Sequence, residues 1–145
     1  MRELLYLKDE QIKELIELIF YVYKETYADH KSILKKHSFG KAHQRVIQLI
    51  ERNENITISN LLKKLKITKQ SLNRVLKDLL KKKIIVQKKG QTDARQRLLK
   101  LDKNGKELFD EFFSQQKNRI YNALKRSEPD SVIKFKKVLK QIANG

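Results

Sequence analysis

Apolar residues recur at helical spacing from about residue 10 to residue 28, and this pattern predicts a first helix. Between residues 15 and 23 every position except Glu17 is apolar, which is more than a single buried stripe requires. A helix that is apolar on several sides must be covered on several sides. It therefore lies deep in a core, or it packs both on its own domain and on a second subunit. The shortness of the chain favours the second arrangement.

Three shorter amphipathic helices are predicted in the middle of the chain. The first covers about residues 41–52, the second begins after the capping residue Thr57, and the third extends over 68–82 with Thr68 as its N-cap. The third helix places its large apolar residues on one stripe, namely Leu72, Val75, Leu76, Leu79 and Leu80. Two helices joined by a short turn, the second with an exposed polar face, are typical of a helix-turn-helix.

A β-hairpin is predicted directly after this helix pair. Residues 84–89 begin with β-branched side chains, residues 90–94 have turn composition, and residues 95–101 can return as the partner strand. Basic side chains gather at the tip of the hairpin around Asp93, namely Lys88, Lys89, Arg95 and Arg97. A charge run is usually a solvated face, but one at the end of a narrow projection can enter a groove. The predicted fold class is mostly α with a small β-hairpin wing.

Two further helices are predicted at the C-terminal end, over about 103–126 after the capping residue Asp102 and over about 129–143. They extend beyond what a winged helix needs for its own core. With the first helix they are predicted to form a dimerisation layer. The predicted dimer-interface residues are Ile12, Leu15, Ile16, Ile19, Phe20, Tyr23, Phe112, Ile120, Leu124, Phe135 and Leu139.

The composition narrows the choice of partner and compartment. A formal net charge of +17 favours a polyanionic partner, although lysine enrichment can also reflect genome composition. The chain has no cysteine, which excludes disulfides and fits a reducing cytoplasm. Its most apolar stretch, residues 15–23, is about half the length that spans a bilayer. We therefore expect a soluble, cytoplasmic protein that has no membrane partner.

The order of these elements, together with the residues of 57–108, resembles the MarR family of bacterial transcriptional regulators. The likeness in helical architecture extends over nearly the whole chain. It implies one domain over residues 1–145, with dimerisation helices at about 10–30 and 103–143. The winged helix-turn-helix, which binds DNA, would occupy about 41–101.

Two short motifs carry this resemblance. The pattern D-x-R-x-R at Asp93, Arg95 and Arg97, followed by L-x-x-x-G from Leu101 to Gly105, is similar to the wing signature of the family. The segments "GKAHQRV" and "ITKQSLNRVL" are most similar to a subgroup labelled PetP-like.

The sequence departs from the family pattern at two positions. Lys83 stands where glycine is common, so we expect the preceding helix not to end there in the left-handed conformation that glycine adopts easily. Asp102 stands where threonine is usual, but aspartate caps a helix equally well.

The polar face of the helix over 68–82 carries side chains of the types that can read DNA bases. Gln70 and Asn73 can each pair with adenine, while Arg74 or Lys69 can address guanine or a phosphate. The face could also serve only to keep the helix soluble, but a solvated face normally mixes both signs of charge. The predicted DNA-binding residues are Thr68, Lys69, Gln70, Ser71, Asn73, Arg74, Lys77, Lys89, Asp93, Arg95 and Arg97.

The resemblance also implies how the wing and the dimer work. Arg95 would enter the minor groove while Asp93 pairs with an arginine, and Arg97 would contact phosphate or only brace the hairpin. A two-fold dimer would place two recognition helices in successive major grooves roughly 34 Å apart, so the operator would be pseudo-palindromic. Repression is the default outcome, and activation stays open.

Many family members release DNA when a small ligand enters the cleft between the dimer layer and the reading domain. The candidate pocket residues here are Tyr27, Phe39 and His43, and the sequence does not name the ligand. His30, His37 and His43 have no metal-site spacing and no cysteine beside them, so neither a metal nor a cofactor is predicted.

Three other classes of function fit the sequence less well. An enzyme is not expected, because the chain has no GxSxG, phosphate-binding loop, GxGxxG or metal-spaced cluster. A general double-stranded nucleic-acid or RNA-binding protein without operator specificity is the alternative, although no RNP-like aromatic strand or GxxG clamp is present. A winged helix that binds only proteins would need a reading face without DNA-contacting side chains.

Overall fold

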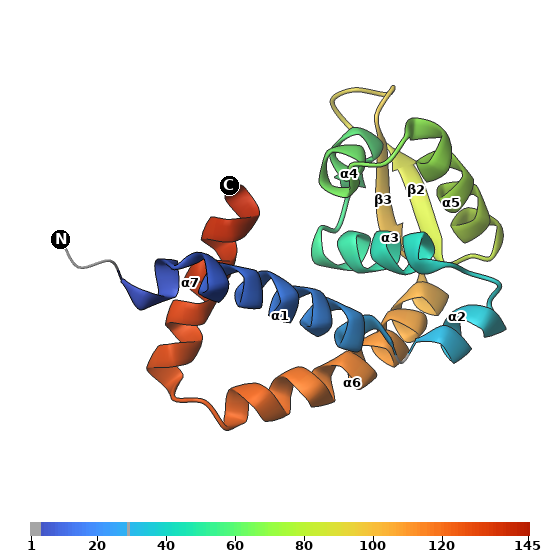
Figure 1. The fold of residues 1–145 in the computed structure, drawn as a ribbon. Coiled ribbons are helices and arrows are strands. Elements are labelled where there is room, and N and C mark those ends of the chain that lie inside the picture. The colour runs from blue at the N-terminus through green and yellow to red at the C-terminus, as the bar shows by residue number, and fades with distance from the viewer. Residues whose placement is uncertain (1–3, 29) are drawn as a thin grey trace. The chain divides into compact units, whose positions relative to one another are not determined.

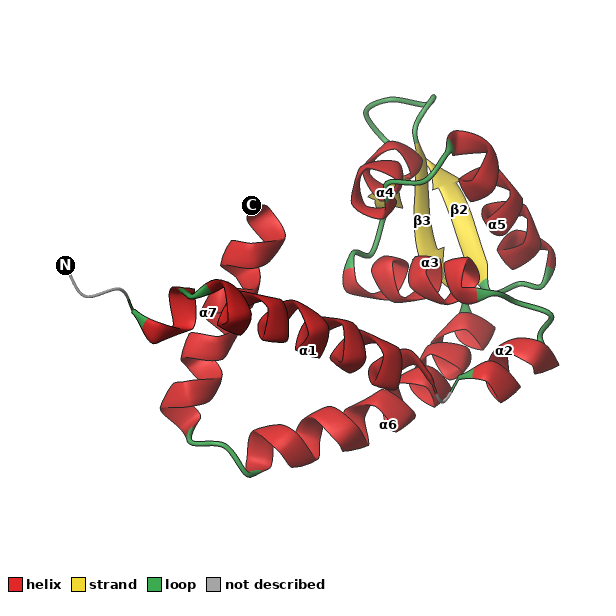
Figure 2. Cartoon of the chain, viewed as in Figure 1, coloured by secondary structure: helices red, strands yellow, loops and turns green. Residues whose placement is uncertain are grey.

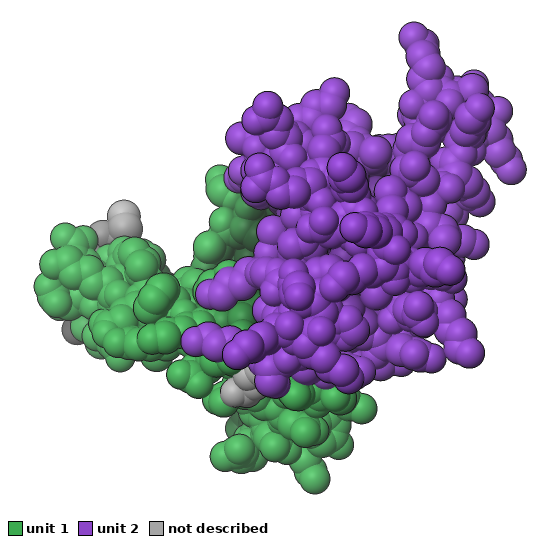
Figure 3. Space-filling view, turned by 90° about the vertical axis from the view of Figure 1, so that its right-hand side faces the viewer, with its two compact units in different colours: residues 1–29, 114–145 green, residues 30–113 purple. Residues whose placement is uncertain are grey.

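The computed structural model describes residues 4–28 and 30–145 (Figure 1, Figure 2). These residues form two compact units (Figure 3). Unit 1 comprises residues 1–29 and 114–145, and unit 2 comprises residues 30–113. The elements in chain order are η1 Leu5–Leu7, α1 Asp9–Ala28, α2 Lys31–Lys36, α3 Lys41–Arg52, β1 Ile56–Thr57, α4 Ile58–Leu65, α5 Lys69–Lys81, β2 Ile85–Lys89, β3 Arg97–Leu101, α6 Lys103–Lys125 and α7 Pro129–Asn144.

Unit 2 is a winged helix built on a small antiparallel sheet. The strand order is β1-β3-β2, with Ile56 opposite Leu99 and Ile85 opposite Leu101. In Figure 1 α4 and α5 lie beside β3 and β2, and α3 also contacts β3. The core between them consists of fully buried aliphatic side chains, including Val46, Ile47, Ile50, Leu61, Leu72, Leu79 and Leu99. The predicted fold class and hairpin are confirmed, and β1 adds a third strand that was not predicted.

The helix caps predicted in the reading region are present. The hydroxyl of Thr57 accepts the N–H of Asn60 at 3.1 Å, and the hydroxyl of Thr68 accepts the N–H of Ser71 at 3.1 Å. Each satisfies a backbone donor that the first turn leaves without an intrahelical partner. Asp102 accepts the N–H of Lys103 at 2.8 Å, where α6 begins.

The prediction for Lys83 was wrong, because this residue does adopt the left-handed conformation, with φ 58. Its N–H donates to the carbonyl of Leu80 at 3.1 Å, and the N–H of Ile84 donates to the carbonyl of Leu79 at 2.9 Å. This is the hydrogen-bond pattern of a Schellman motif, which normally has glycine at the left-handed position. Ile84 is buried in the core, and this burial holds the lysine in its costly conformation.

Unit 1 leaves most of its apolar surface uncovered. Neither α1 nor α7 buries a residue within the chain. Its elements include an ion pair between Arg119 and Glu25, with 3.6 Å between Nη2 and Oε2. Among the described residues, no helix has the length and apolar character needed to cross a bilayer. The exposed apolar helices instead resemble half of a protein core, as expected for a surface that a second chain covers.

Candidate nucleic-acid interface

The reading face of α5 is defined here as Thr68, Lys69, Gln70, Ser71, Asn73, Arg74 and Lys77. All seven side chains are exposed, whereas Leu72, Val75, Leu76 and Leu79 on the opposite stripe are buried. This division follows from the helical period, because the apolar stripe fixes which side of the helix faces the core. The structure therefore brings together on one face the residues that were predicted to contact DNA on this helix.

The start of α5 is held rigidly and suits a phosphate. The hydroxyl of Thr68 donates to the Oγ of Ser71 at 2.8 Å while it accepts the backbone N–H of the same residue. The N-terminal end of a helix carries a partial positive charge, and Lys69 adds a full charge in the first turn. This end of the helix is therefore where a DNA backbone would be attracted most strongly.

The wing tip is closed by its own hydrogen bonds. Asp93 accepts the backbone N–H of Arg95 at 2.9 Å through Oδ1, which also lies 3.4 Å from the Nε of the same arginine. The guanidinium of Arg97 donates to the carbonyl of Ala94 at 2.9 Å. Arg97 thus braces the hairpin, while the Arg95 side chain, 94% exposed, projects beyond it. Lys89 is exposed and stands opposite Arg97 in the strand register.

The residues of the predicted ligand pocket lie in different units. Phe39 and His43 belong to unit 2, where their rings stack with centroids 4.7 Å apart and planes inclined by 11°. Tyr27 is on α1 in unit 1, and its ring lies 5.0 Å from that of Tyr23. The stacked pair is part of the packing around α3, and the role of the three residues in ligand binding stays a prediction.

The other two histidines make different contacts in unit 2. His30 is fully buried, its Nδ1 lies 2.6 Å from the Nε2 of Gln44, and its ring lies 5.3 Å from that of Phe112. His37 stacks on Phe39 with centroids 5.7 Å apart. Each of the three histidines is therefore engaged in packing or hydrogen bonding inside the unit.

Phe112 is not on the surface of the chain. Its side chain is fully buried in the core of unit 2, whereas every other predicted interface residue is exposed in this chain. The neighbouring Phe113 is 46% exposed. The burial of Phe112 argues against its predicted place in a dimer interface, because the apolar face of α6 is covered by the chain itself at this point.

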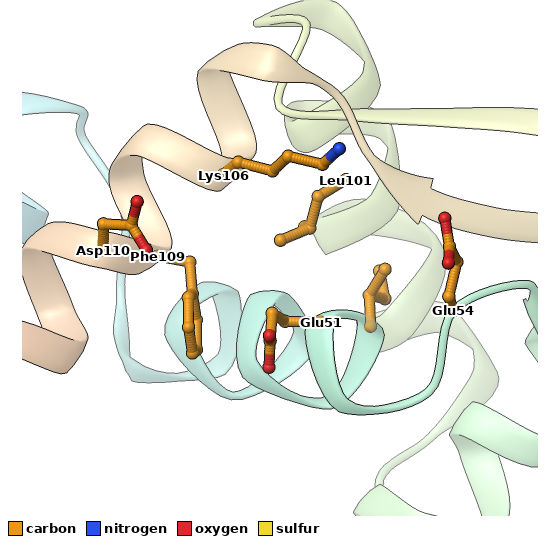
Figure 4. Close-up of a pocket in the computed structure, with 7 residues that line it drawn as sticks. Glu51, Glu54, Leu101, Lys106, Phe109 and Asp110 are labelled. Atoms are coloured by element: carbon orange, nitrogen blue, oxygen red, sulfur yellow. The ribbon is translucent and has the colours of Figure 1, made fainter.

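Unit 2 also has a cavity of about 360 Å³ that the sequence did not indicate (Figure 4). Its apolar lining is Ile50, Leu101 and Phe109, and its charged lining is Glu51, Glu54, Asp110 and Lys106. Three carboxylates against one ammonium group disfavour a phosphate there. Cations dominate instead on α5 and the wing, so these elements suit a phosphate backbone better than this cavity does.

Comparison with known proteins places the chain in a family. The model of the MarR family matches residues 41–96, which include α3, β1, α4, α5, β2 and the tip of the wing but end before β3. The HTH-type transcriptional regulator PetP of Rhodobacter capsulatus is 38% identical over 136 residues, covering 94% of this chain and 82% of PetP. The chain belongs to the MarR family.

Solved structures share the fold of this MarR-family chain. Streptococcus pneumoniae FabT in complex with DNA superposes with a TM-score of 0.72 and 19% identity, over 94% of this chain and 96% of FabT. NadR in complex with 4-hydroxyphenylacetate superposes with a TM-score of 0.74 and 22% identity, over 99% of this chain and 98% of NadR. At these identities the likeness concerns the fold.

Proposed function

We propose that this MarR-family protein is a homodimeric, sequence-specific transcriptional regulator that reads a pseudo-palindromic operator in the cytoplasm. The observation that carries the proposal is the exposed reading face of α5, with amide, hydroxyl and guanidinium groups beside the projecting Arg95 of the wing. An α-helix fits the major groove, where each base pair displays a distinct pattern of donors and acceptors. The arginine of the wing enters the adjacent minor groove.

Dimerisation supplies the second reading face. The exposed apolar residues of α1, α6 and α7 give each copy a surface to bury against the other, and they include Ile16, Phe20 and Leu139. A two-fold axis then presents two α5 helices to half-sites about one helical turn, roughly 34 Å, apart. Because an occupied promoter excludes polymerase, repression is the default outcome. The protein acts by occupying DNA and catalyses no reaction.

A small-molecule effector that releases the DNA fits the same architecture. Support comes from the related fold of NadR, which holds 4-hydroxyphenylacetate. Tyr27, Phe39 and His43 are the residues proposed to respond to such a ligand. The effector of this chain need not share that chemistry, because pocket residues vary independently of the fold.

The experiment is a selection of bound duplexes from a random library, followed by affinity measurements at several salt concentrations. The selected sites should be imperfect palindromes. If each dimer neutralises on the order of 6–10 phosphates, affinity should fall by about 10³–10⁵ between 50 and 200 mM salt. Single-stranded RNA of the same length should compete poorly. Equal binding to all duplexes, or preferential binding to RNA, would refute operator recognition and favour a general nucleic-acid-binding protein.

A further inference from the structure

One residue of α5 does not suit a helix that approaches phosphates. Asp78 is the single acidic residue between Lys69 and Lys81, and its side chain is 47% exposed. A carboxylate in this position repels the phosphates of DNA, so its presence on this helix indicates another role. Its Oδ2 lies 2.9 Å from the Nε2 of His43 on α3, a residue whose side chain is only 15% exposed. The acid therefore links the reading helix to a neighbouring helix.

The hydrogen bonds of His43 define which ring nitrogen carries the proton. The backbone N–H of Gly40 donates to Nδ1 at 3.0 Å, so Nδ1 is the acceptor in the neutral ring. The proton then sits on Nε2, which donates to the carboxylate of Asp78. Gly40 is the N-cap of α3, so one ring ties the beginning of α3 to the middle of α5.

A column of stacked rings holds the imidazole ring of His43 in its orientation. His37, Phe39 and His43 stack in succession, with inclinations of 18° and 11° between neighbouring planes. Lys82 also contacts this column, because its ammonium lies 5.0 Å from the centroid of Phe39 and donates to the carbonyl oxygen of His37. Lys82 follows Asp78 by one helical turn. The rings thus contact α5 at Asp78 and, one turn later, at its C-cap residue Lys82.

We propose that His43 is a positioning residue for DNA recognition. The apolar stripe fixes which side of α5 faces the core, and the hydrogen bond from His43 to Asp78 sets the finer rotation of the helix about its own axis. This finer rotation determines which base edges Gln70, Asn73 and Arg74 reach. The inference rests on the proposed function and adds a residue outside the reading face. Phosphate contacts tolerate small rotations of the helix, whereas bidentate base contacts do not. Loss of the link should therefore reduce affinity for the operator more than affinity for arbitrary DNA.

The first test replaces Asp78 with alanine in the full chain. The probes are the duplex selected by the wild-type protein and a shuffled duplex of the same length and composition. We expect affinity for the selected duplex to fall about tenfold, which corresponds to the loss of roughly one base-pair contact. Affinity for the shuffled duplex should stay the same or rise, because a negative charge is removed. Stronger binding of both duplexes would show that Asp78 is only a surface charge and would overturn the inference.

A pair of substitutions at position 43 separates positioning from folding. In His43→Gln the amide nitrogen stands near the place of Nε2 and can still donate to Asp78. In His43→Asn the shorter amide can accept from Gly40 but cannot reach Asp78. Operator affinity should be retained within about threefold in His43→Gln and fall about tenfold in His43→Asn. Equal operator affinity in the two variants would contradict the inference even if Asp78→Ala fails to fold.

Glu51→Ala is the matched control, because it removes an exposed carboxylate from α3 without touching the link. It should bind both duplexes at least as well as the wild-type protein. If the wild-type protein selects no preferred duplex, the proposed function fails and the inference fails with it. If the wild-type protein discriminates between the duplexes and Asp78→Ala discriminates equally well, only the positioning role fails.

Discussion

An ideal Cβ atom on Gly105 would lie 2.1 Å from the backbone carbonyl oxygen of Ile84. The same oxygen accepts the N–H of Asp102 at 2.9 Å, immediately before α6. The first turn of α6 therefore lies directly against the residue that opens the wing, and only glycine allows this approach. This contact gives a physical reason for the glycine of the L-x-x-x-G motif that begins at Leu101.

Gly105→Ala should destabilise the protein, because backbone on both sides of the contact must move to admit one methyl group. Overpacking of this kind costs about 1–3 kcal/mol, and an obstacle made of backbone favours the upper part of that range. Equilibrium unfolding in urea measures the change. Asn104→Ala in the same turn is the control and should stay within about 0.5 kcal/mol of the wild-type protein. Equal stability of the two variants would contradict the contact.

Lys83→Gly should stabilise the protein by about 1 kcal/mol. A residue with a side chain costs roughly 1–2 kcal/mol in the left-handed conformation, and glycine removes this cost. The greater conformational freedom of glycine in the unfolded chain offsets part of the gain. The same urea experiment measures it. Lys81→Gly is the control, since Lys81 is the last helical residue of α5 and glycine there should destabilise. A loss of stability in Lys83→Gly would show that the lysine makes an interaction worth more than its backbone strain.

The elements that are proposed to face DNA could be predicted because their signals are local. The apolar stripe of α5, the cap at Thr68 and the turn residues of the hairpin all lie within a few positions of the structure they determine. Two elements give no such signal. The six residues of α2, Lys31–Lys36, are too few to show a helical period, and β1, Ile56–Thr57, is a strand only because β3 pairs with it.

The features that could not be predicted from the sequence depend on contacts between residues far apart in the chain. His43 and Asp78 are 35 positions apart, so nothing near Asp78 reveals why an acid stands on the reading helix. Phe112 shows the converse problem, because periodicity finds the apolar face of α6 but not which element covers it. The left-handed Lys83 depends on the burial of Ile84, which is a property of the folded core.

Ile16→Glu should convert the protein into a monomer. The side chain of Ile16 is 63% exposed in the isolated chain and lies on the most apolar stretch of α1. A carboxylate placed in an apolar interface loses its hydration, and such a penalty amounts to several kcal/mol. Sedimentation velocity at micromolar concentration measures the oligomeric state.

The control for Ile16→Glu is Glu14→Lys, which changes an exposed residue of α1 that is already charged and should leave the dimer intact. The new lysine would also stand one turn after Glu10, where the two opposite charges attract each other. A dimer in Ile16→Glu would place the interface elsewhere. A monomer in the wild-type protein would remove the basis for a palindromic operator.

Arg74→Ala should lower the ability of the protein to distinguish its selected duplex from a shuffled one. Arg74 is an exposed residue of the reading face, and a good bidentate contact to a base is worth about 1–3 kcal/mol of discrimination. Fluorescence anisotropy with both duplexes gives the ratio of affinities. Lys81→Ala removes the same charge farther along α5 and should lower the affinity for both duplexes by the same factor. An unchanged ratio in Arg74→Ala would exclude it from base reading.

Arg95→Ala should weaken binding to every duplex. The loss of affinity should depend less on the base sequence under the recognition helix than the loss caused by Arg74→Ala. The Arg95 side chain is 94% exposed at the wing tip, where its backbone is held by Asp93. An arginine in the minor groove responds to groove width, and A/T-rich segments have the narrower groove. The wild-type protein should therefore prefer selected sites with A/T-rich flanks over the same sites with G/C-rich flanks, and Arg95→Ala should lose this preference.

Arg95→Lys separates this effect from charge alone. Lysine keeps the cation, so affinity at low salt should be largely retained, but it lacks the planar guanidinium and should show a smaller preference for A/T-rich flanks. Titrations with the two flanking designs at one salt concentration measure this preference. If Arg95→Ala keeps the wild-type preference, the wing does not read groove width. The A/T preference would then arise from bending of the duplex by the dimer, and it would persist in every variant of the wing.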